Sequence, residues 1–74
     1  MTIDEVFDEG AIKVFTDKMS AKLEVKRMQG RGGWFNDDII SVDALQEMLQ
    51  EHVDREDWVD VANLAMMLYF RRAL

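Results

Sequence analysis

The sequence contains no cysteine, no proline and only one histidine among its 74 residues. Without cysteine the chain has no disulfide, no zinc site built from thiolates and no nucleophilic thiol. The lone His52 excludes a metal site built from several histidines of one chain. Because proline is absent and the four glycines fall in only two places, we expect the segments between the glycines to be helical.

The short length of the chain limits its core. It allows one domain, residues 1–74, and a domain of this size buries only about 60% of the surface that its unfolded chain exposes. Apolar residues make up 49% and charged residues 32% of the sequence, a balance typical of a folded, soluble protein. Since the disulfides and structural metals of other small domains are missing, we expect a homo-oligomer to complete the core.

Charge is unevenly distributed along the chain. The net charge of −6 argues against binding to nucleic acid or to an anionic membrane surface. Residues 13–31 nevertheless hold six basic and two acidic residues, whereas residues 37–60 hold nine acidic residues and one basic residue. Opposite poles of this kind are compatible with self-association, with an anionic ligand on the basic segment, or simply with solvated helix faces.

The N-terminus does not have the pattern of a signal peptide. It is acidic, and no basic region followed by an apolar stretch is present. The longest apolar run, residues 64–70, is much shorter than the about 20 residues that span a bilayer. We therefore expect a cytoplasmic protein without a membrane partner.

The first segment has two adjacent apolar stripes at three- and four-residue steps. One comprises Phe7, Ala11, Val14, Ala21, Val25 and Met28, and the other comprises Ile12, Phe15, Met19 and Leu23. They predict a helix of about 18 to 25 residues that ends at Gly30, and together they are wider than one partner helix can cover. Gly10 marks a candidate break, in which case residues 1–9 form a separate short helix or a mobile arm.

The remainder of the chain predicts a loop and two more helices. Residues 31–40 have turn chemistry, and the aromatic side chains there either tuck under the fold or stack on a ligand. Ser41 is the expected N-cap of a second helix with one apolar side. After a turn within residues 54–57, residues 58–70 are apolar on nearly every side, which predicts a central buried helix. The expected fold is all-α, with a C-terminal helical hairpin packed against a long N-terminal helix.

Residues 19–68 resemble a known protein family. The residues that carry the resemblance are Lys22-Leu23, Lys26-Arg27, Gly32-Gly33-Trp34, the segment from Leu45 to His52, and the run Asp60-Val61-Ala62-Asn63-Leu64-Ala65-Met66-Met67-Leu68. They look like those of short phage and prophage proteins related to the MazG-like all-α nucleotide pyrophosphatases. The resemblance implies a helical oligomer that holds magnesium on two carboxylate pairs and cleaves a nucleoside triphosphate to its monophosphate and pyrophosphate.

Carried over to this sequence, the resemblance places the magnesium ligands at Glu51, Asp54, Asp57 and Asp60. Magnesium needs oxygen ligands in octahedral geometry, so carboxylates from two helices must converge on one point. In this sequence only two residues separate the first pair, Glu51 and Asp54, from the second pair, Asp57 and Asp60. At the helical period of 100° per residue, Glu51 and Asp54 lie on the side of their helix opposite its apolar face. The expectation is a protein that requires no cofactor, with magnesium as the alternative.

A second set of residues suits a phosphate-bearing ligand. Lysines recur every four residues from Lys18 to Lys26, and with Arg31 they can pair with phosphate oxygens while Trp34 or Phe35 stacks on a base. Asp60 and Asn63 lie three residues apart on an otherwise apolar helix, and burying them unpaired would be costly. The predicted ligand-binding residues are Lys22, Lys26, Arg31, Trp34, Asp60 and Asn63. The alternative is that Asp60 pairs with Arg31, Arg27 or a loop amide and only fixes the loop.

Three functions follow as expectations. The first is a phage-type oligomer that binds a nucleotide or nucleotide-derived signal without turnover, to counter a defence in the cytoplasm of an infected bacterial host. The second is a magnesium-dependent nucleoside triphosphate pyrophosphatase with a site between subunits. The third is a small acidic inhibitor of a host protein. No catalytic residue is assigned.

Overall fold

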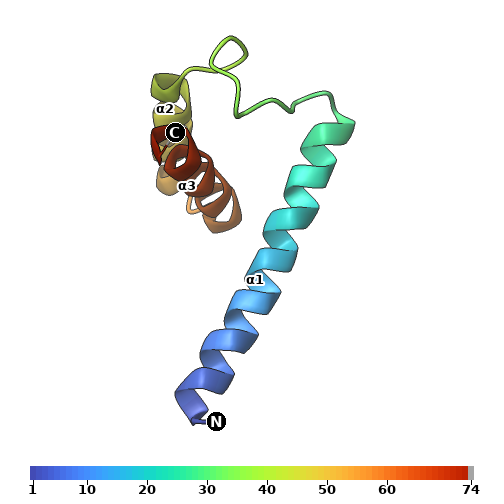
Figure 1. Cartoon of the computed structure of the whole chain (residues 1–74), viewed down its shortest axis with the longest axis vertical. Helices are drawn as coiled ribbons and strands as arrows, with labels where there is room; N and C mark the ends of the chain where they lie inside the picture. Colours follow the sequence, from blue (N-terminus) through green and yellow to red (C-terminus); the bar gives the residue numbers. More distant parts are fainter. Residues whose placement is uncertain (74) are drawn as a thin grey trace.

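Three helices make up the computed structural model, which describes residues 1–73. They are α1 (Ile3–Met28), α2 (Val42–Asp54) and α3 (Trp58–Ala73). α2 and α3 form a hairpin, and α1 packs against α3, so α3 is the central element (Figure 1). The N-terminal half of α1 projects beyond the hairpin and gives the molecule its long dimension, 45 Å against 27 and 25 Å. The predicted all-α fold, with a hairpin against a long N-terminal helix, is confirmed.

α1 begins at a capping box and runs through Gly10 without interruption. The Thr2 hydroxyl accepts a hydrogen bond from the backbone N–H of Glu5 (3.1 Å), and the Thr2 N–H donates to the Glu5 carboxylate (3.4 Å). The expected break at Gly10 is therefore wrong. One interior glycine costs a helix about 1 kcal/mol, whereas a break would require a second, unfavourable helix nucleation.

α1 ends in a Schellman motif, as the position of Gly30 predicted. The N–H of Arg31 donates to the carbonyl of Lys26 (2.8 Å), and the N–H of Gly30 donates to the carbonyl of Arg27 (3.0 Å). Gly30 has a φ of +74°, which only glycine adopts at little cost. The motif satisfies carbonyls at the end of the helix and turns the chain towards α2.

The core lies between α2 and α3. Its buried side chains are Leu45, Leu64, Met67 and Leu68. α2 starts at Ser41, whose hydroxyl accepts a hydrogen bond from the N–H of Ala44 (3.0 Å), as expected for an N-cap. The prediction that α3 is buried on nearly every side is wrong for one side, because two neighbouring helices leave Trp58, Tyr69 and Phe70 exposed. Within residues 1–73 no helix is both long and apolar enough to cross a membrane.

Arg71 fixes the loop between α1 and α2. Its guanidinium donates hydrogen bonds to the carbonyl oxygens of Trp34 and Ile40, both at 2.8 Å, and to the carboxylate of Asp37 at 2.7 Å. The arginine side chain is 7% exposed. Arg71 therefore has a tertiary role that no local pattern in the sequence indicates.

We expect Gly33→Ala to lower the free energy of unfolding by about 1 to 2 kcal/mol, because Gly33 has a φ of +84°. An added Cβ would also lie 2.5 Å from the Cδ1 atom of Ile39, which must then move. Gly32→Ala is the matched control, since a Cβ there meets no atom within 4 Å. Chemical denaturation of both variants measures the difference. Equal free energies of unfolding for the two variants would contradict the argument from the positive φ of Gly33.

Candidate functional site

A buried carboxylate joins α1 to α3. Asp60 lies in the first turn of α3 and is 5% exposed. Its Oδ2 atom lies 2.6 Å from the Nζ atom of Lys22, and its Oδ1 atom lies 3.4 Å from the Nζ atom of Lys26. The two lysines are four residues apart on one face of α1, so one carboxylate can engage both. The expected pairing of Asp60 with Arg31, Arg27 or a loop amide is replaced by these two lysines.

The environment of Asp60 favours its ionised form. Burial by itself raises the pKa of Asp60, because desolvation disfavours the charge. Lys22, and to a smaller extent Lys26, lowers the pKa through a hydrogen bond and a positive charge. Together the two lysines outweigh the effect of burial and leave the pKa of Asp60 below its ordinary value of 3.8. Asp60 is thus a permanent counter-charge for two lysines at neutral pH and not a proton donor or acceptor.

Asn63 makes the second polar contact between α1 and α3, one turn after Asp60. It is completely buried, and its Nδ2 atom donates a hydrogen bond to the carbonyl oxygen of Met19 (3.1 Å). Its Oδ1 atom is buried without a hydrogen-bond partner among the described residues. The amide therefore fixes the position of α1 along α3 at the cost of one unsatisfied acceptor.

His52 lies beside this pair at the end of α2. Its Nδ1 atom is 3.0 Å from the Oδ2 atom of Asp57 and 3.8 Å from the Oδ2 atom of Asp60. His52 is partly buried. The three side chains gather where α2, the turn and α3 meet, and within the group His52 and Asp57 are hydrogen-bonded.

The arrangement of carboxylates does not fit the expected magnesium site. Asp57 and Asp60 gather with His52, within 4.8 Å of one another, but Glu51 and Asp54 are exposed and lie outside this group. The carboxylate of Asp54 instead accepts a hydrogen bond from Gln50. Both oxygens of Asp60 face lysine ammonium groups, which would repel a divalent cation. The four carboxylates of one chain therefore do not form a magnesium site in the part of the chain that is described.

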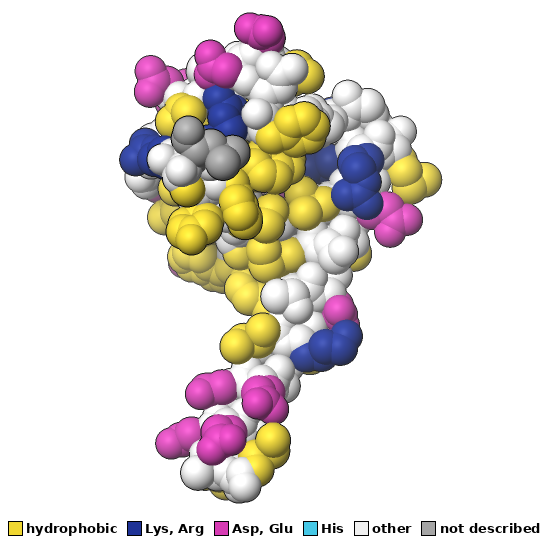
Figure 2. Space-filling model, viewed as in Figure 1, with side chains coloured by type: hydrophobic (Ala, Val, Ile, Leu, Met, Phe, Trp, Pro, Cys, Tyr) yellow, Lys and Arg dark blue, Asp and Glu magenta, His cyan; other side chains and the backbone are white. Residues whose placement is uncertain are grey.

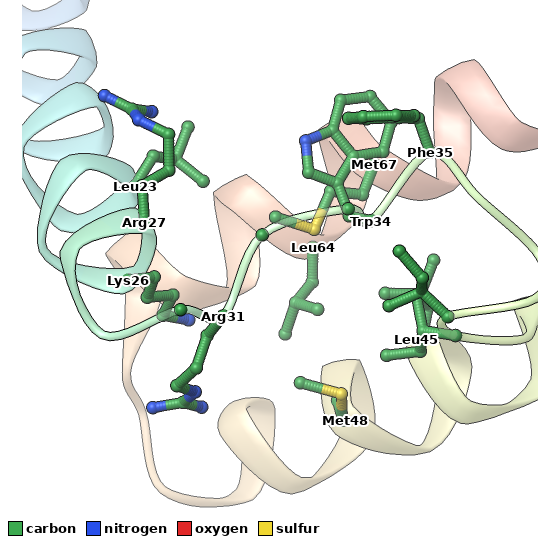
Figure 3. A pocket seen from close by; sticks show the side chains of 15 residues that line it. Leu23, Lys26, Arg27, Arg31, Trp34, Phe35, Leu45, Met48, Leu64 and Met67 are labelled. Atoms are coloured by element: carbon green, nitrogen blue, oxygen red, sulfur yellow. The ribbon is translucent and has the colours of Figure 1, made fainter.

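A cavity of about 430 Å³ lies on the other side of Lys26, between the end of α1, the loop and the hairpin. Leu45 and Met48 of α2 and Leu64 and Met67 of α3 form its apolar floor (Figure 3). Trp34 and Phe35 of the loop lie over one side, and Arg27 and Arg31 extend from the end of α1 on the other. The remaining lining residues are Leu23, Lys26, Gly30, Gly32, Gly33, Ile39 and Ile40.

The two arginines give the cavity its electrostatic character. Arg27 and Arg31 are exposed, and neither forms an ion pair with a carboxylate in the part of the chain that is described. In Figure 3 their guanidinium groups point in opposite directions, both away from the apolar side chains of the floor. Lys26 also lines the cavity, but its ammonium group is held in an ion pair with Asp60 (3.4 Å). The cavity therefore combines an apolar interior with two cations at its rim.

Aromatic contacts fix the wall of the cavity that lies opposite the two arginines. The rings of Trp34 and Phe70 are tilted with centroids 6.3 Å apart, and Trp34 meets Phe35 edge to face at 5.8 Å. Trp34 is partly buried, whereas Phe35 is 68% exposed. Trp34 therefore packs on the fold and also lines the cavity, and its stacking on a ligand stays a prediction.

The structure divides the six predicted ligand-binding residues into two groups. Lys26, Arg31 and Trp34 line the cavity, whereas Lys22, Asp60 and Asn63 hold α1 against α3. Sequence reasoning gave Arg27 only a pairing role, although it lies in the same basic segment as Arg31. It also missed Arg71, which positions the loop wall and carries no local signal.

The cavity suits binding rather than covalent chemistry. Its polar lining consists of basic side chains, the indole N–H and loop backbone, and none of the residues that line it carries a carboxylate, an imidazole, a thiol or a hydroxyl group. Such a set can pair with an anion and stack on a planar ring, and its one amine, that of Lys26, is held in an ion pair with Asp60. Comparisons with protein-family models, with curated proteins and with solved structures find no match to this chain.

Proposed function

We propose that this protein binds a nucleotide-type small molecule in the cavity beside the Gly-Gly-Trp loop and does not turn it over. The observation that carries the proposal is the pairing of an aromatic wall, Trp34 and Phe35, with two cations, Arg27 and Arg31, that no described carboxylate balances. A nucleotide has the matching chemistry, because its base offers a planar ring and its phosphates offer oxygens to guanidinium groups.

The dimensions of the cavity support a ligand of this size. Its volume of about 430 Å³ lies within the usual range for small-molecule pockets, about 300 to 1,000 Å³. The interior is mostly apolar with a few polar groups at the rim, the common composition of such pockets. Binding without turnover agrees with the lack of carboxylates, imidazoles and hydroxyl groups in the lining.

The resemblance to phage proteins related to MazG-like pyrophosphatases gives the proposal its biological setting. A phage protein that sequesters a nucleotide signal would counter a defence of the infected bacterium without needing catalysis. We propose that it acts in this way as a homo-oligomer and without a cofactor. The alternative, a magnesium-dependent pyrophosphatase, requires carboxylates from a second subunit, because Glu51 and Asp54 lie away from Asp57 and Asp60 here.

Thermal-shift titration with mono-, di- and triphosphates and cyclic dinucleotides, with and without magnesium, tests the proposal. We expect at least one nucleotide to raise the melting temperature and to remain intact. Arg31→Ala and Trp34→Ala should each weaken its binding by about tenfold or more, because a charged hydrogen bond or a stacked base contributes about 1 to 3 kcal/mol.

Lys13→Ala is the matched control, because Lys13 is an exposed base on α1 that pairs with Asp17 and does not line the cavity. It removes the same charge and should leave the affinity unchanged. Binding that survives both cavity substitutions would place the ligand elsewhere. Magnesium-dependent release of pyrophosphate would instead support the pyrophosphatase and contradict binding without turnover.

A further inference from the structure

One long apolar stripe of α1 has no partner among residues 1–73. α1 contacts α3 through the face that holds Met19, Leu23 and Lys26, the three partly buried residues of this helix. The other stripe points away from this face and stays exposed. Its large members are 72% exposed at Phe7, 58% at Val14, 52% at Val25 and 80% at Met28. These side chains lie on a stable helix yet contribute nothing to the core.

The spacing of this stripe is that of a helix pairing with another helix. Phe7, Ala11, Val14, Lys18, Ala21, Val25 and Met28 follow one another at alternating steps of four and three residues. Such a spacing keeps these seven residues, called the seam from here on, facing a neighbouring helix over the whole length of α1. An open apolar hollow lies beside the first half of the seam, between α1 and Val59 at the start of α3. The surface therefore has room for a helix along it.

The charges of α1 identify which helix fits. The start of α1 carries four acidic residues, Asp4, Glu5, Asp8 and Glu9, and Figure 2 shows acidic side chains gathered at the projecting end of the molecule. The rest of α1 carries five basic residues against two acidic ones, and it stays net positive even after Asp60 of α3 pairs with two of the lysines: Lys13, Lys18, Lys22, Lys26 and Arg27 against Asp17 and Glu24. A parallel second α1 would place like charges side by side, whereas an antiparallel one would place each acidic start along a basic second half.

We infer that α1 pairs with α1 of a second copy of this chain in an antiparallel coiled coil, which forms a homodimer. In the register that aligns the two seams, Phe7 lies opposite Val25 of the second copy, and Ala11 lies opposite Ala21. Val14 then lies opposite Lys18 near the twofold axis. The pairing covers the exposed apolar stripe and extends the small core of each chain.

The small and polar residues of the seam fit this register. Ala11 and Ala21 face each other on both sides of the axis and allow the helix backbones to approach closely. Lys18 can lay its aliphatic stem along Val14 while its ammonium group stays in water. A polar residue at one seam position also selects a single register and orientation, at some cost in stability. The inference stands on α1 alone and does not depend on a ligand in the cavity.

Sedimentation velocity across micromolar to millimolar concentrations tests the dimer. We expect the wild type to sediment as a dimer and Val14→Asp to sediment as a monomer with unchanged helical circular dichroism, since Val14 lies outside the core. Thr16→Asp is the matched control, because it adds the same charge to an exposed position of α1 on the side away from the seam, and it should remain a dimer. A monomeric wild type, or a dimeric Val14→Asp variant, would overturn the inference.

Cross-linking tests the orientation cleanly, because the natural chain has no cysteine. A mixture of Ala11→Cys and Ala21→Cys chains should form a disulfide-linked heterodimer on mild oxidation. Ala11→Cys alone should cross-link poorly, since two copies of position 11 would lie about 15 Å apart along antiparallel helices, beyond the about 7 Å that a disulfide spans. Efficient cross-linking of Ala11→Cys with itself would indicate a parallel pair and reject the proposed register. Neither readout involves a nucleotide, so this test and that of the proposed function fail independently.

Discussion

Replacing Asp60 with alanine is expected to lower the free energy of unfolding by about 3 kcal/mol and the melting temperature by about 15 °C. The carboxylate is buried and engages Lys22 and Lys26 of α1. Without it, two ammonium groups remain side by side at the contact between α1 and α3, with no counter-charge between them. The effect lies at the lower end for a broken buried ion pair, because the Lys22 side chain is 49% exposed and keeps part of its hydration.

The exposed pair of Lys13 and Asp17 provides the control for Asp60→Ala. It has a similar distance, 2.8 Å, but both side chains are largely in water. Asp17→Ala should therefore change the free energy of unfolding by less than about 0.5 kcal/mol. Thermal and chemical denaturation of the two variants compares the pairs directly. An Asp60→Ala variant as stable as Asp17→Ala would show that α1 does not depend on this contact.

The lowered pKa of Asp60 sets the pH range of this contribution. A carboxyl group whose pKa falls on folding stabilises the native state above its unfolded pKa and loses that contribution as the pH falls through the lower, folded value. The contribution of Asp60 is therefore complete above its ordinary pKa of 3.8 and fades below it. The stability difference between the wild type and Asp60→Asn should be constant near neutral pH and should shrink below about pH 4. A constant difference into strong acid would contradict this assignment.

Arg71→Ala is expected to have a comparable effect, lowering the free energy of unfolding by about 3 kcal/mol, since each hydrogen bond from a charged group contributes about 1.5 to 3 kcal/mol and the three are not additive. The substitution leaves the carbonyl oxygens of Trp34 and Ile40 without their donor. It also releases the loop that forms the aromatic wall of the cavity. Nucleotide binding should therefore be lost together with stability.

The neighbouring arginine is the natural control for Arg71→Ala. Arg72 is exposed and makes one side-chain hydrogen bond, to the amide oxygen of Gln46 (3.1 Å). Arg72→Ala should change stability by about 0.5 kcal/mol or less and leave nucleotide binding intact. Amide hydrogen exchange locates the effect, because only Arg71→Ala should accelerate exchange in residues 31–40. Unchanged exchange there would show that the loop is held by other contacts.

The basic residues of α1 serve two purposes that the sequence does not separate. Lys22 and Lys26 look like a phosphate-binding stripe, because they are evenly spaced on one helix face. In the structure both lysines pair with the single carboxylate of Asp60, and only Lys26 also reaches the cavity. Arg27 and Arg31 come from the same segment but lie where no described carboxylate balances them. A ligand would therefore meet the arginines first.

Local features of the fold could be predicted from the sequence because their causes are local. Ser41 and Gly30 mark the start of α2 and the end of α1, and both act through hydrogen bonds within a few residues. Gly10 misled the prediction, because the cost of one interior glycine is smaller than that of breaking a long, well-capped helix. The three-helix architecture followed from these signals and from the apolar spacing.

The sequence by itself determined three helices, their caps, the loop with its aromatic residues and the wide apolar surface of α1. Only the tertiary structure decided which polar groups meet: Asp60 with two lysines, Asn63 with a mid-helix carbonyl, and Arg71 with the loop. The physical reason is the distance along the chain over which each kind of interaction acts. Caps and helical periods depend on neighbours within about one turn, whereas these contacts join residues 31 to 44 positions apart, and their partners depend on how whole helices cross.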